Sequence, residues 1–157
     1  MNRLQIQWYP GHMAKGKRNL SEQLKLVDMV IEVLDARIPY SSANPDFNQL
    51  LGKKPRLVIL NKADLADPGY TKEWIRHFKT LGIEFGESKI SPKKTLLPRA
   101  LRAIVVGIPN VGKSSLINSL VKKNMARTGD KPGVTKGKQW IRVLPNLELL
   151  DTPGLLW

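Results

Sequence analysis

The residues with the clearest chemical meaning lie at positions 107–115, which read Gly-Ile-Pro-Asn-Val-Gly-Lys-Ser-Ser. Glycines at this spacing let backbone N–H groups curl around an anion, and a helix that begins at the end of the loop adds its own N–H groups and positive dipole end. The lysine of such a loop reaches the β- and γ-phosphates of a nucleotide, and the next hydroxyl binds magnesium. We predict nucleotide contacts from Asn110, Val111, Gly112, Lys113, Ser114 and Ser115.

A second set of polar residues follows an apolar run at residues 56–60. Asn61, Lys62 and Asp64 belong to the sequence Asn-Lys-Ala-Asp. A carboxylate at Asp64 can accept hydrogen bonds from N1–H and the 2-amino group of guanine, whereas adenine has no donor at N1 and no 2-amino group. Asn61 would face the O6/N7 edge, and the Lys62 stem would pack along the base. Since a site built on buried hydrogen bonds rejects the analogue that lacks them, we expect GTP to be preferred over ATP.

The predicted elements position both loops. Apolar, β-branched runs predict strands at 29–34, 56–60 and 103–106, with weaker strands at 83–85, 139–143 and 147–150. Helical spacing predicts helices at about 13–26, 46–51, 70–80 and 116–121, and a short one after Ser91 that carries Leu96, Leu97 and Leu101 inward. The segments 38–45 and 125–138 have the composition of loops. Alternating strands and helices indicate an α/β fold with a mostly parallel sheet between two helical layers.

Charge points to a polyanionic partner. The 157 residues carry a net charge of +13, and residues 89–142 hold 13 Lys or Arg against the single acid Asp130. This basic half surrounds the phosphate loop, so RNA is one explanation and a solvated surface that also neutralises nucleotide phosphates is the other. The candidate RNA contacts are Lys15, Lys17, Arg18, Lys136 and Lys138.

Other features exclude several classes of protein. The chain has no cysteine, so it forms no disulfide and has no thiolate ligand or cysteine nucleophile. Its first residues lack the apolar core of a signal peptide, and no apolar run approaches the length that spans a membrane. We therefore expect a cytoplasmic protein without membrane or disulfide partners.

Three motifs together resemble those of the translation-factor class of GTPases: the two loops above and Asp-Thr-Pro-Gly at 151–154. The guanine motif precedes the phosphate loop, the reverse of the usual order, which is typical of circularly permuted GTPases. The sequences Trp-Tyr-Pro-Gly-His-Met at 8–13, Asp-Ala-Arg-Ile-Pro at 35–39 and Pro-Gly-Val-Thr at 132–135 resemble signatures of the ribosome biogenesis GTPase A (RbgA/YlqF) family. This resemblance covers essentially the whole chain and implies a three-layer P-loop GTPase fold with a circularly permuted motif order.

The resemblance implies further site residues. Thr135 would bind magnesium through its hydroxyl and sense the γ-phosphate, Asp151 would hold magnesium through water, and the Gly154 N–H would contact the γ-phosphate. Asn110 matches an asparagine that holds potassium against the phosphates in related GTPases, although a turn-forming role is also open. The family's remaining guanine-contacting loop should lie near Ser88, where the match is poor.

The position after Gly154 is Leu155, whereas many GTPases place there a glutamine that orients the attacking water. By resemblance, the candidate for this role is His12, which we expect on a Pro-Gly turn. The alternative is that His12 contacts RNA or caps the following helix. His77 is expected to be structural.

These observations favour a GTPase that acts with GTP, GDP and magnesium, and with potassium if Asn110 binds it, in assembly of the large ribosomal subunit. Its partners would be a large-subunit precursor and its rRNA. A nucleotide-gated RNA-binding module with negligible hydrolysis and an ATP-dependent P-loop enzyme are the alternatives. The chain is expected to be one GTP-binding domain over 1–157 without the family's C-terminal helical domain, as a truncated domain or a shortened relative.

Overall fold

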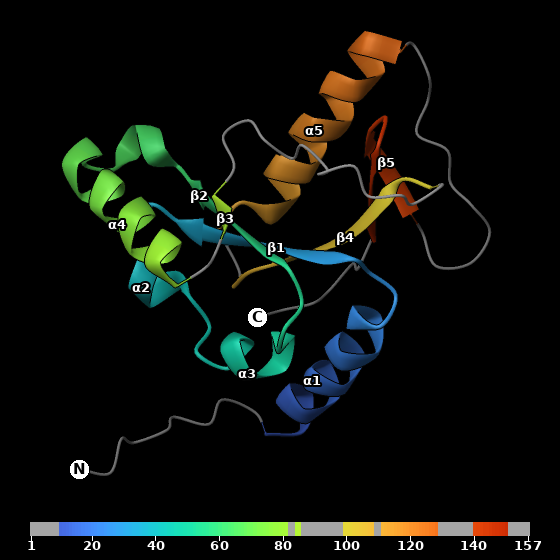
Figure 1. The fold of residues 1–157 in the computed structure, drawn as a ribbon, viewed down its shortest axis with the longest axis horizontal. Coiled ribbons are helices and arrows are strands. Elements are labelled where there is room, and N and C mark those ends of the chain that lie inside the picture. The colour runs from blue at the N-terminus through green and yellow to red at the C-terminus, as the bar shows by residue number, and fades with distance from the viewer. Residues whose placement is uncertain (1–9, 82–83, 86–98, 109–110, 129–139, 151–157) are drawn as a thin grey trace.

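The computed structural model describes residues 10–81, 84–85, 99–108, 111–128 and 140–150, and the following statements concern these residues (Figure 1). The helices are α1 (Pro10–Leu24), α2 (Pro39–Ser42), α3 (Phe47–Leu51), α4 (Pro68–Thr80) and α5 (Lys113–Thr128), with a 3₁₀ turn, η1, at Ala63–Leu65. The strands are β1 (Met29–Asp35), β2 (Arg56–Asn61), β3 (Glu84–Phe85), β4 (Leu101–Val106), β5 (Trp140–Leu144) and β6 (Leu147–Leu150).

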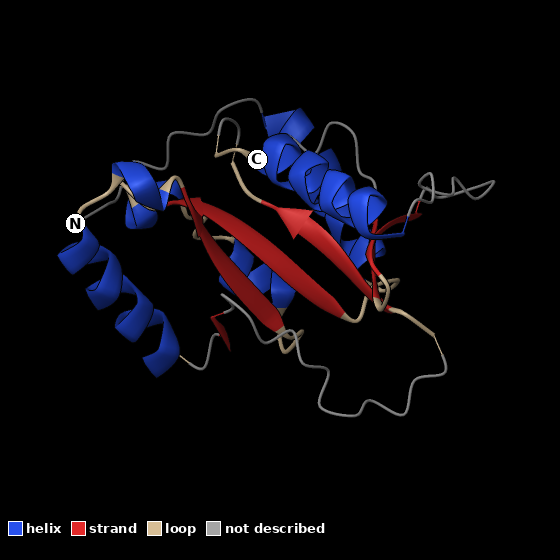
Figure 2. Cartoon of the chain, turned by 90° about the horizontal axis from the view of Figure 1, so that it is seen from above, coloured by secondary structure: helices blue, strands red, loops and turns tan. Residues whose placement is uncertain are grey.

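The described strands form one sheet in the order β3-β2-β1-β4-β6-β5. Neighbours pair in parallel except β5, which pairs antiparallel to β6 through the turn at residues 145–146. Seen from above, the strands show the twist expected of such a sheet (Figure 2). Because parallel strands end at the same edge, the segments that follow β1, β2 and β4 begin side by side.

Helices cover both faces of the sheet, which confirms the three-layer α/β prediction (Figure 1). On one face, Leu20 and Leu24 of α1 and two α3 residues pack on side chains of β1, β4 and β6. On the other face, the apolar side of α5 packs on a cluster that includes Ile31 and Val33 of β1. Phe78 of α4 packs against Leu34 and Val58, at the β2 end of the sheet. Successive residues of β1 therefore face opposite helical layers, which explains why its sequence is apolar except at Glu32 and the final Asp35.

The start of α1 carries no acidic residue to offset its dipole, and basic residues follow in its second turn. Two tertiary contacts stabilise this helix despite its unfavourable charge at the N-terminus. Leu20 is fully buried, and the Lys17 Nζ atom lies 2.8 Å from Asp46 Oδ2 beside α3. Packing thus holds α1 in place, and one of its cations already has an acidic partner.

Several predicted boundaries were wrong. Residues 39–42, predicted as a loop, form α2, because Pro39 suits the first turn of a helix and the Ser42 N–H donates to Ile38 O. Leu101, predicted to lie on a helix, begins β4 and pairs with Leu147. The segment predicted as a loop from Met125 is helical through Thr128, since α5 continues past its apolar stretch. The remainder of that segment and the helix predicted after Ser91 lie outside the described residues.

Candidate functional site

The carboxyl edge of the sheet brings together three segments that the sequence keeps far apart. Asp35 and Asn61 are register partners at the ends of β1 and β2, and the Ala36 N–H donates to Asn61 O at 2.8 Å. On the other side of β1, Glu32 pairs with Val106, the last residue of β4. The phosphate loop therefore begins beside β1, and the Asn-Lys-Ala-Asp segment begins on β1's opposite flank.

The described part of the phosphate loop lies directly against β1. A Cβ atom at Gly107 would stand only 2.7 Å from Val33 O, so the loop approaches the strand more closely than a side chain would allow. Lys113 is half-buried, and its Nζ donates to Gly107 O across the loop. Burial lowers the pKa of the Lys113 ammonium from its usual 10.5. Bound phosphates would oppose this shift, because a nearby anion favours the charged form of the amine.

Asn61 joins the two predicted nucleotide loops. Its Nδ2 donates to Val111 O at 2.8 Å, a contact between residues 50 positions apart. Gly112 lies against the same amide and has a φ of +95°, a conformation that glycine adopts readily. The side chain that was predicted to face the base therefore also fixes the backbone of the phosphate loop.

The remaining residues of the predicted guanine motif are accessible. Asp64 is exposed within η1, and Lys62 is half-buried with its Nζ atom 3.6 Å from Asp35 Oδ2. Lys62 has a φ of +60°, which places it in the left-handed region. The Asp64 carboxylate is therefore accessible to a base that binds from solvent. The Lys62 amine is paired with the buried carboxylate of Asp35.

The hydroxyls predicted to contact phosphate and magnesium lie at the start of α5. Ser114 and Ser115 are both exposed in its first turn. Exposed hydroxyls beside a cationic lysine and helical N–H groups suit a phosphate with its hard cation, since magnesium prefers oxygen ligands. Within the described ranges no group of three or more His, Cys, Asp or Glu side chains could hold a metal ion.

Sequence reasoning missed one buried acid at this edge. Asp35 was noted only as part of a family signature, yet it is 5% exposed and accepts hydrogen bonds from the Arg37 N–H, Nε and Nη2 groups. Its own N–H donates to Ser42 Oγ at 2.9 Å. These arginine hydrogen bonds, opposed by burial and aided by the charges of Arg37 and Lys62, lower the pKa of Asp35 to about 2. Its position at the end of an apolar strand, like that of Asn61, was the available signal.

Several predicted site residues lie outside the described ranges: Asn110, Thr135, Asp151 and Gly154, together with the segment around Ser88. The backbone of His12 lies in the first turn of α1, not on the expected non-helical turn. Pro10 begins the helix because proline suits its first position. His77 is exposed on α4, with its ring 5.6 Å from that of Trp74.

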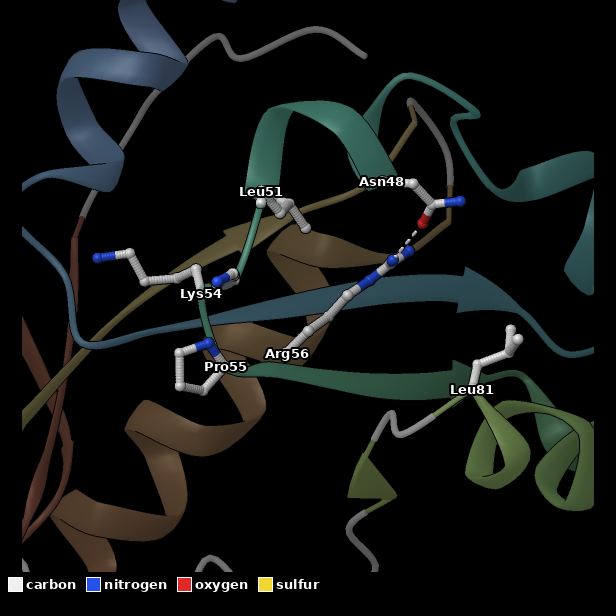
Figure 3. A pocket seen from close by; sticks show the side chains of 8 residues that line it. Asn48, Leu51, Lys54, Pro55, Arg56 and Leu81 are labelled. Atoms are coloured by element: carbon white, nitrogen blue, oxygen red, sulfur yellow. Dashed lines mark hydrogen bonds between the residues drawn. The ribbon is translucent and has the colours of Figure 1, made fainter.

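A basic pocket of about 430 Å³ lies at the amino end of β2 (Figure 3). It is opposite the carboxyl edge of the sheet, which holds the predicted nucleotide residues and is called the nucleotide edge below. Its lining includes Arg56, whose Nη1 donates to Asn48 Oδ1 at 2.6 Å and whose Nε donates to Glu32 Oε2 at 2.7 Å. Lys54 donates to Val27 O at 2.9 Å. Two cations of the pocket lining, Arg56 and Lys54, therefore form hydrogen bonds within the fold, and we assign no ligand to this pocket.

Comparison with known proteins agrees with this geometry. Residues 102–157 match the family model described as 50S ribosome-binding GTPase. Ribosome biogenesis GTPase A from Bacillus cereus is 52% identical over 97% of this chain and 59% of the relative. The protein of the same name from Thermotoga maritima is 41% identical over 97% of this chain and 60% of the relative. A solved structure, the GDP-bound structure of TM YlqF, superposes with a TM-score of 0.63 at 36% identity, covering 89% of this chain and 59% of that chain.

The chain spans about 60% of the length of the relatives named ribosome biogenesis GTPase A. The alignment with the Bacillus cereus protein runs over 175 positions, against 157 residues here, so that relative carries segments with no counterpart in this chain. Within the described ranges, no helix has the length and apolar content needed to cross a bilayer.

Proposed function

Because this chain belongs to the ribosome biogenesis GTPase A family, we propose that it binds GDP and GTP and hydrolyses GTP while acting in assembly of the large ribosomal subunit. The observation that carries the proposal is the contact between Asn61 and the phosphate loop at Val111. It joins a segment with guanine chemistry to a segment with phosphate chemistry at one edge of the sheet. A guanine nucleotide is the ligand whose two ends match these two segments.

Different residues would bind the base and the phosphates of the nucleotide. Asp64 would accept hydrogen bonds from the guanine N1–H and 2-amino groups, and the stem of Lys62 would lie along the base. Lys113 would exchange its contact with Gly107 O for the phosphates, and its charge would stabilise negative charge that shifts during phosphoryl transfer. Ser114 would bind magnesium, with Asp151 and Thr135 as the further candidates and Gly154 as a γ-phosphate contact. Magnesium would neutralise part of the negative charge on the phosphates.

Hydrolysis also needs a group that orients water, and Leu155 cannot hydrogen-bond through its side chain. We propose His12 for this role, since a histidine both donates and accepts near neutral pH. Its test is His12→Ala, measured for GTP affinity and for subunit-stimulated turnover. Loss of turnover with unchanged binding supports the role. Turnover within about threefold of the original, a change of roughly 0.6 kcal/mol in the barrier, rejects it.

Asn110 is proposed to hold a potassium ion beside the phosphates. A second cation there would stabilise charge in the transition state, so turnover should be faster in potassium than in sodium at equal ionic strength. Asn110→Ala should remove that difference. Equal rates of the original protein in both salts would leave Asn110 with a turn-forming role.

The proposed partner is a large-subunit precursor bound through its rRNA, and the proposed location is the cytoplasm. The names of the relatives and the net charge of +13 support this assignment. Lys15 and Arg18 are exposed on α1 and remain candidate contacts. Lys17 is a weaker candidate than its sequence suggested, because Asp46 already neutralises it.

Calorimetric titration of the chain with GDP, GTP and ATP tests the nucleotide assignment. We expect GDP and GTP to bind and ATP to fail as a competitor; tight ATP binding that GDP does not displace would reject the proposal.

Asp64→Asn should shift preference from GDP toward xanthosine diphosphate, because the amide presents a donor to the 2-oxo group where the carboxylate accepted from the 2-amino group. Phosphate release with and without ribosomal subunits then distinguishes an enzyme from a nucleotide-gated binding module.

A further inference from the structure

Asp35 connects the end of β1 to the segment that would read the base. Its carboxylate is nearly inaccessible, and two cations reach it from different directions. Arg37 comes from the loop that follows β1 and Lys62 from the loop that follows β2. The acid thus ties together two loops that lie on neighbouring strands of the nucleotide edge.

Lys62 has an unfavourable backbone conformation. Among the described residues it is the one non-glycine residue with a positive φ, at +60°. Left-handed backbone costs free energy for residues with a Cβ atom and persists only where the surroundings determine it. The ion pair with Asp35, together with the contacts of Asn61 on one side and η1 on the other, supplies such surroundings.

The direction of the Lys62 side chain matters for binding if its stem packs along the base. A lysine with a free amine samples many rotamers, whereas a lysine anchored at Nζ by a buried acid keeps its stem in a narrow range. From this geometry we infer that Asp35 is a positioning residue for guanine recognition, and that it acts through Lys62. This inference rests on the proposed guanine site.

A double-mutant cycle on GDP affinity tests the inference. Asp35→Asn should weaken GDP binding roughly tenfold, because the amide keeps the shape but loses the charge that anchors the amine. Lys62→Met keeps an apolar stem without the amine and should weaken binding by a similar factor. If Asp35 acts through Lys62, the two losses are not additive, and the double variant binds GDP about as well as Lys62→Met alone.

Asp28→Asn is the matched control. Asp28 is also a partly buried acid held by an arginine, since both its oxygens accept from Arg99 and Oδ2 also accepts from the Arg102 N–H. It precedes β1 at the opposite edge of the sheet, so its loss should leave GDP affinity within about twofold. An equal loss of affinity in Asp28→Asn would overturn the inference, as would additive losses from Asp35→Asn and Lys62→Met.

If Asp35→Asn does not fold, Lys62 provides the same test from the other side of the pair. Lys62→Arg still presents a cation to Asp35 and should bind GDP more tightly than Lys62→Met; equal affinities of these two variants would overturn the inference. Failure of the unaltered chain to bind GDP would instead reject the proposed function. GDP binding by the unaltered chain with no effect of Asp35→Asn would reject the inference alone.

Discussion

At the scale of single residues, the nucleotide edge depends on close approaches that leave no room for added atoms. Asn61 hydrogen-bonds the phosphate loop, and Gly112 lies directly against its amide. The buried carboxylate of Asp35 forms an ion pair with the Lys62 amine. Each of these contacts joins a residue at the end of one strand to a residue of a different segment, so a substitution at one position should alter the other.

Gly112→Ala should weaken GDP binding at least tenfold and lower the melting temperature. An added Cβ would stand 2.2 Å from Asn61 Nδ2, at a φ of +95° that side chains rarely adopt. The Asn61 amide must then move away from Val111 O, which disrupts both loops at once.

The matched control for this substitution is Gly52→Ala. Gly52 also has a positive φ, of +55°, but a Cβ atom there meets nothing within 4 Å. It should cost stability, by about 1–2 kcal/mol from backbone strain, and leave GDP affinity unchanged. Equal effects of the two substitutions on affinity would show that backbone strain, not the Asn61 contact, is responsible.

The pH dependence of stability should carry a contribution from Asp35. Arg37 hydrogen bonds lower its pKa from 3.8 to about 2 in the folded state. A group with a lowered folded pKa contributes stability that is present above the unfolded pKa and is lost as pH falls through the folded pKa. The difference in unfolding free energy between the original chain and Asp35→Asn should therefore shrink between about pH 4 and pH 2. Urea denaturation across this range would measure it, and parallel curves would contradict it.

At the scale of elements, a buried ion pair joins β1, β2 and α3 on the face opposite α5. Glu32 is 0% exposed, and its Oε2 accepts two hydrogen bonds from Arg56, which also bonds Asn48. Glu32 Oε1 has no hydrogen-bond partner among the described residues. Burial raises the pKa of Glu32, and Arg56 opposes that shift. The pair is therefore sensitive to loss of either partner.

Arg56→Met should destabilise the fold by roughly 3–5 kcal/mol, because it leaves a buried carboxylate without its cation. The double variant Glu32→Met with Arg56→Met should be more stable than Arg56→Met alone, since it removes the unpaired acid as well. Urea denaturation at neutral pH measures both. As a control, Asn48→Ala removes only the exposed arm of the network and should cost about 1 kcal/mol. A double variant less stable than the single one would contradict this account.

At the scale of the whole molecule, positive charge is the dominant property. The net charge of +13 is far above what binding a single nucleotide requires, and it favours association with a polyanion. The structure refines which cations are available on α1, because Lys15 and Arg18 are exposed while Lys17 is paired with Asp46. Lys136 and Lys138 lie outside the described ranges.

Charge reversal at Lys15 and Arg18 should weaken binding to large-subunit particles and flatten its dependence on salt, because fewer counterions are released. The control pair, Lys72→Glu with Lys79→Glu, makes the same change in net charge on exposed positions of α4. Sedimentation with subunits at several salt concentrations measures both pairs. If the two pairs weaken binding equally, net charge and not the α1 surface governs association.

The sequence alone predicted the two nucleotide-binding loops and determined most strand positions. The phosphate loop and the guanine motif are each a short contiguous pattern, and their chemistry is carried by residue type at fixed spacing. β1, β2 and β6 were predictable because a strand buried between two helical layers is mostly apolar. Local patterns were less informative at α2, where proline and serine residues suit both a loop and a first helical turn.

Only the tertiary structure decided what those loops touch. The Asn61 contact with Val111, the Lys62 contact with Asp35 and the burial of Glu32 all depend on which strands become neighbours in the sheet. A sequence read in order places Glu32 in an apolar strand and Lys17 on a charged helix without showing the partner of either. Arg56 lies 24 residues from Glu32, because parallel pairing joins strands that are separated by a crossover. Asp46 reaches Lys17 because α1 and α3 pack on the same face of the sheet.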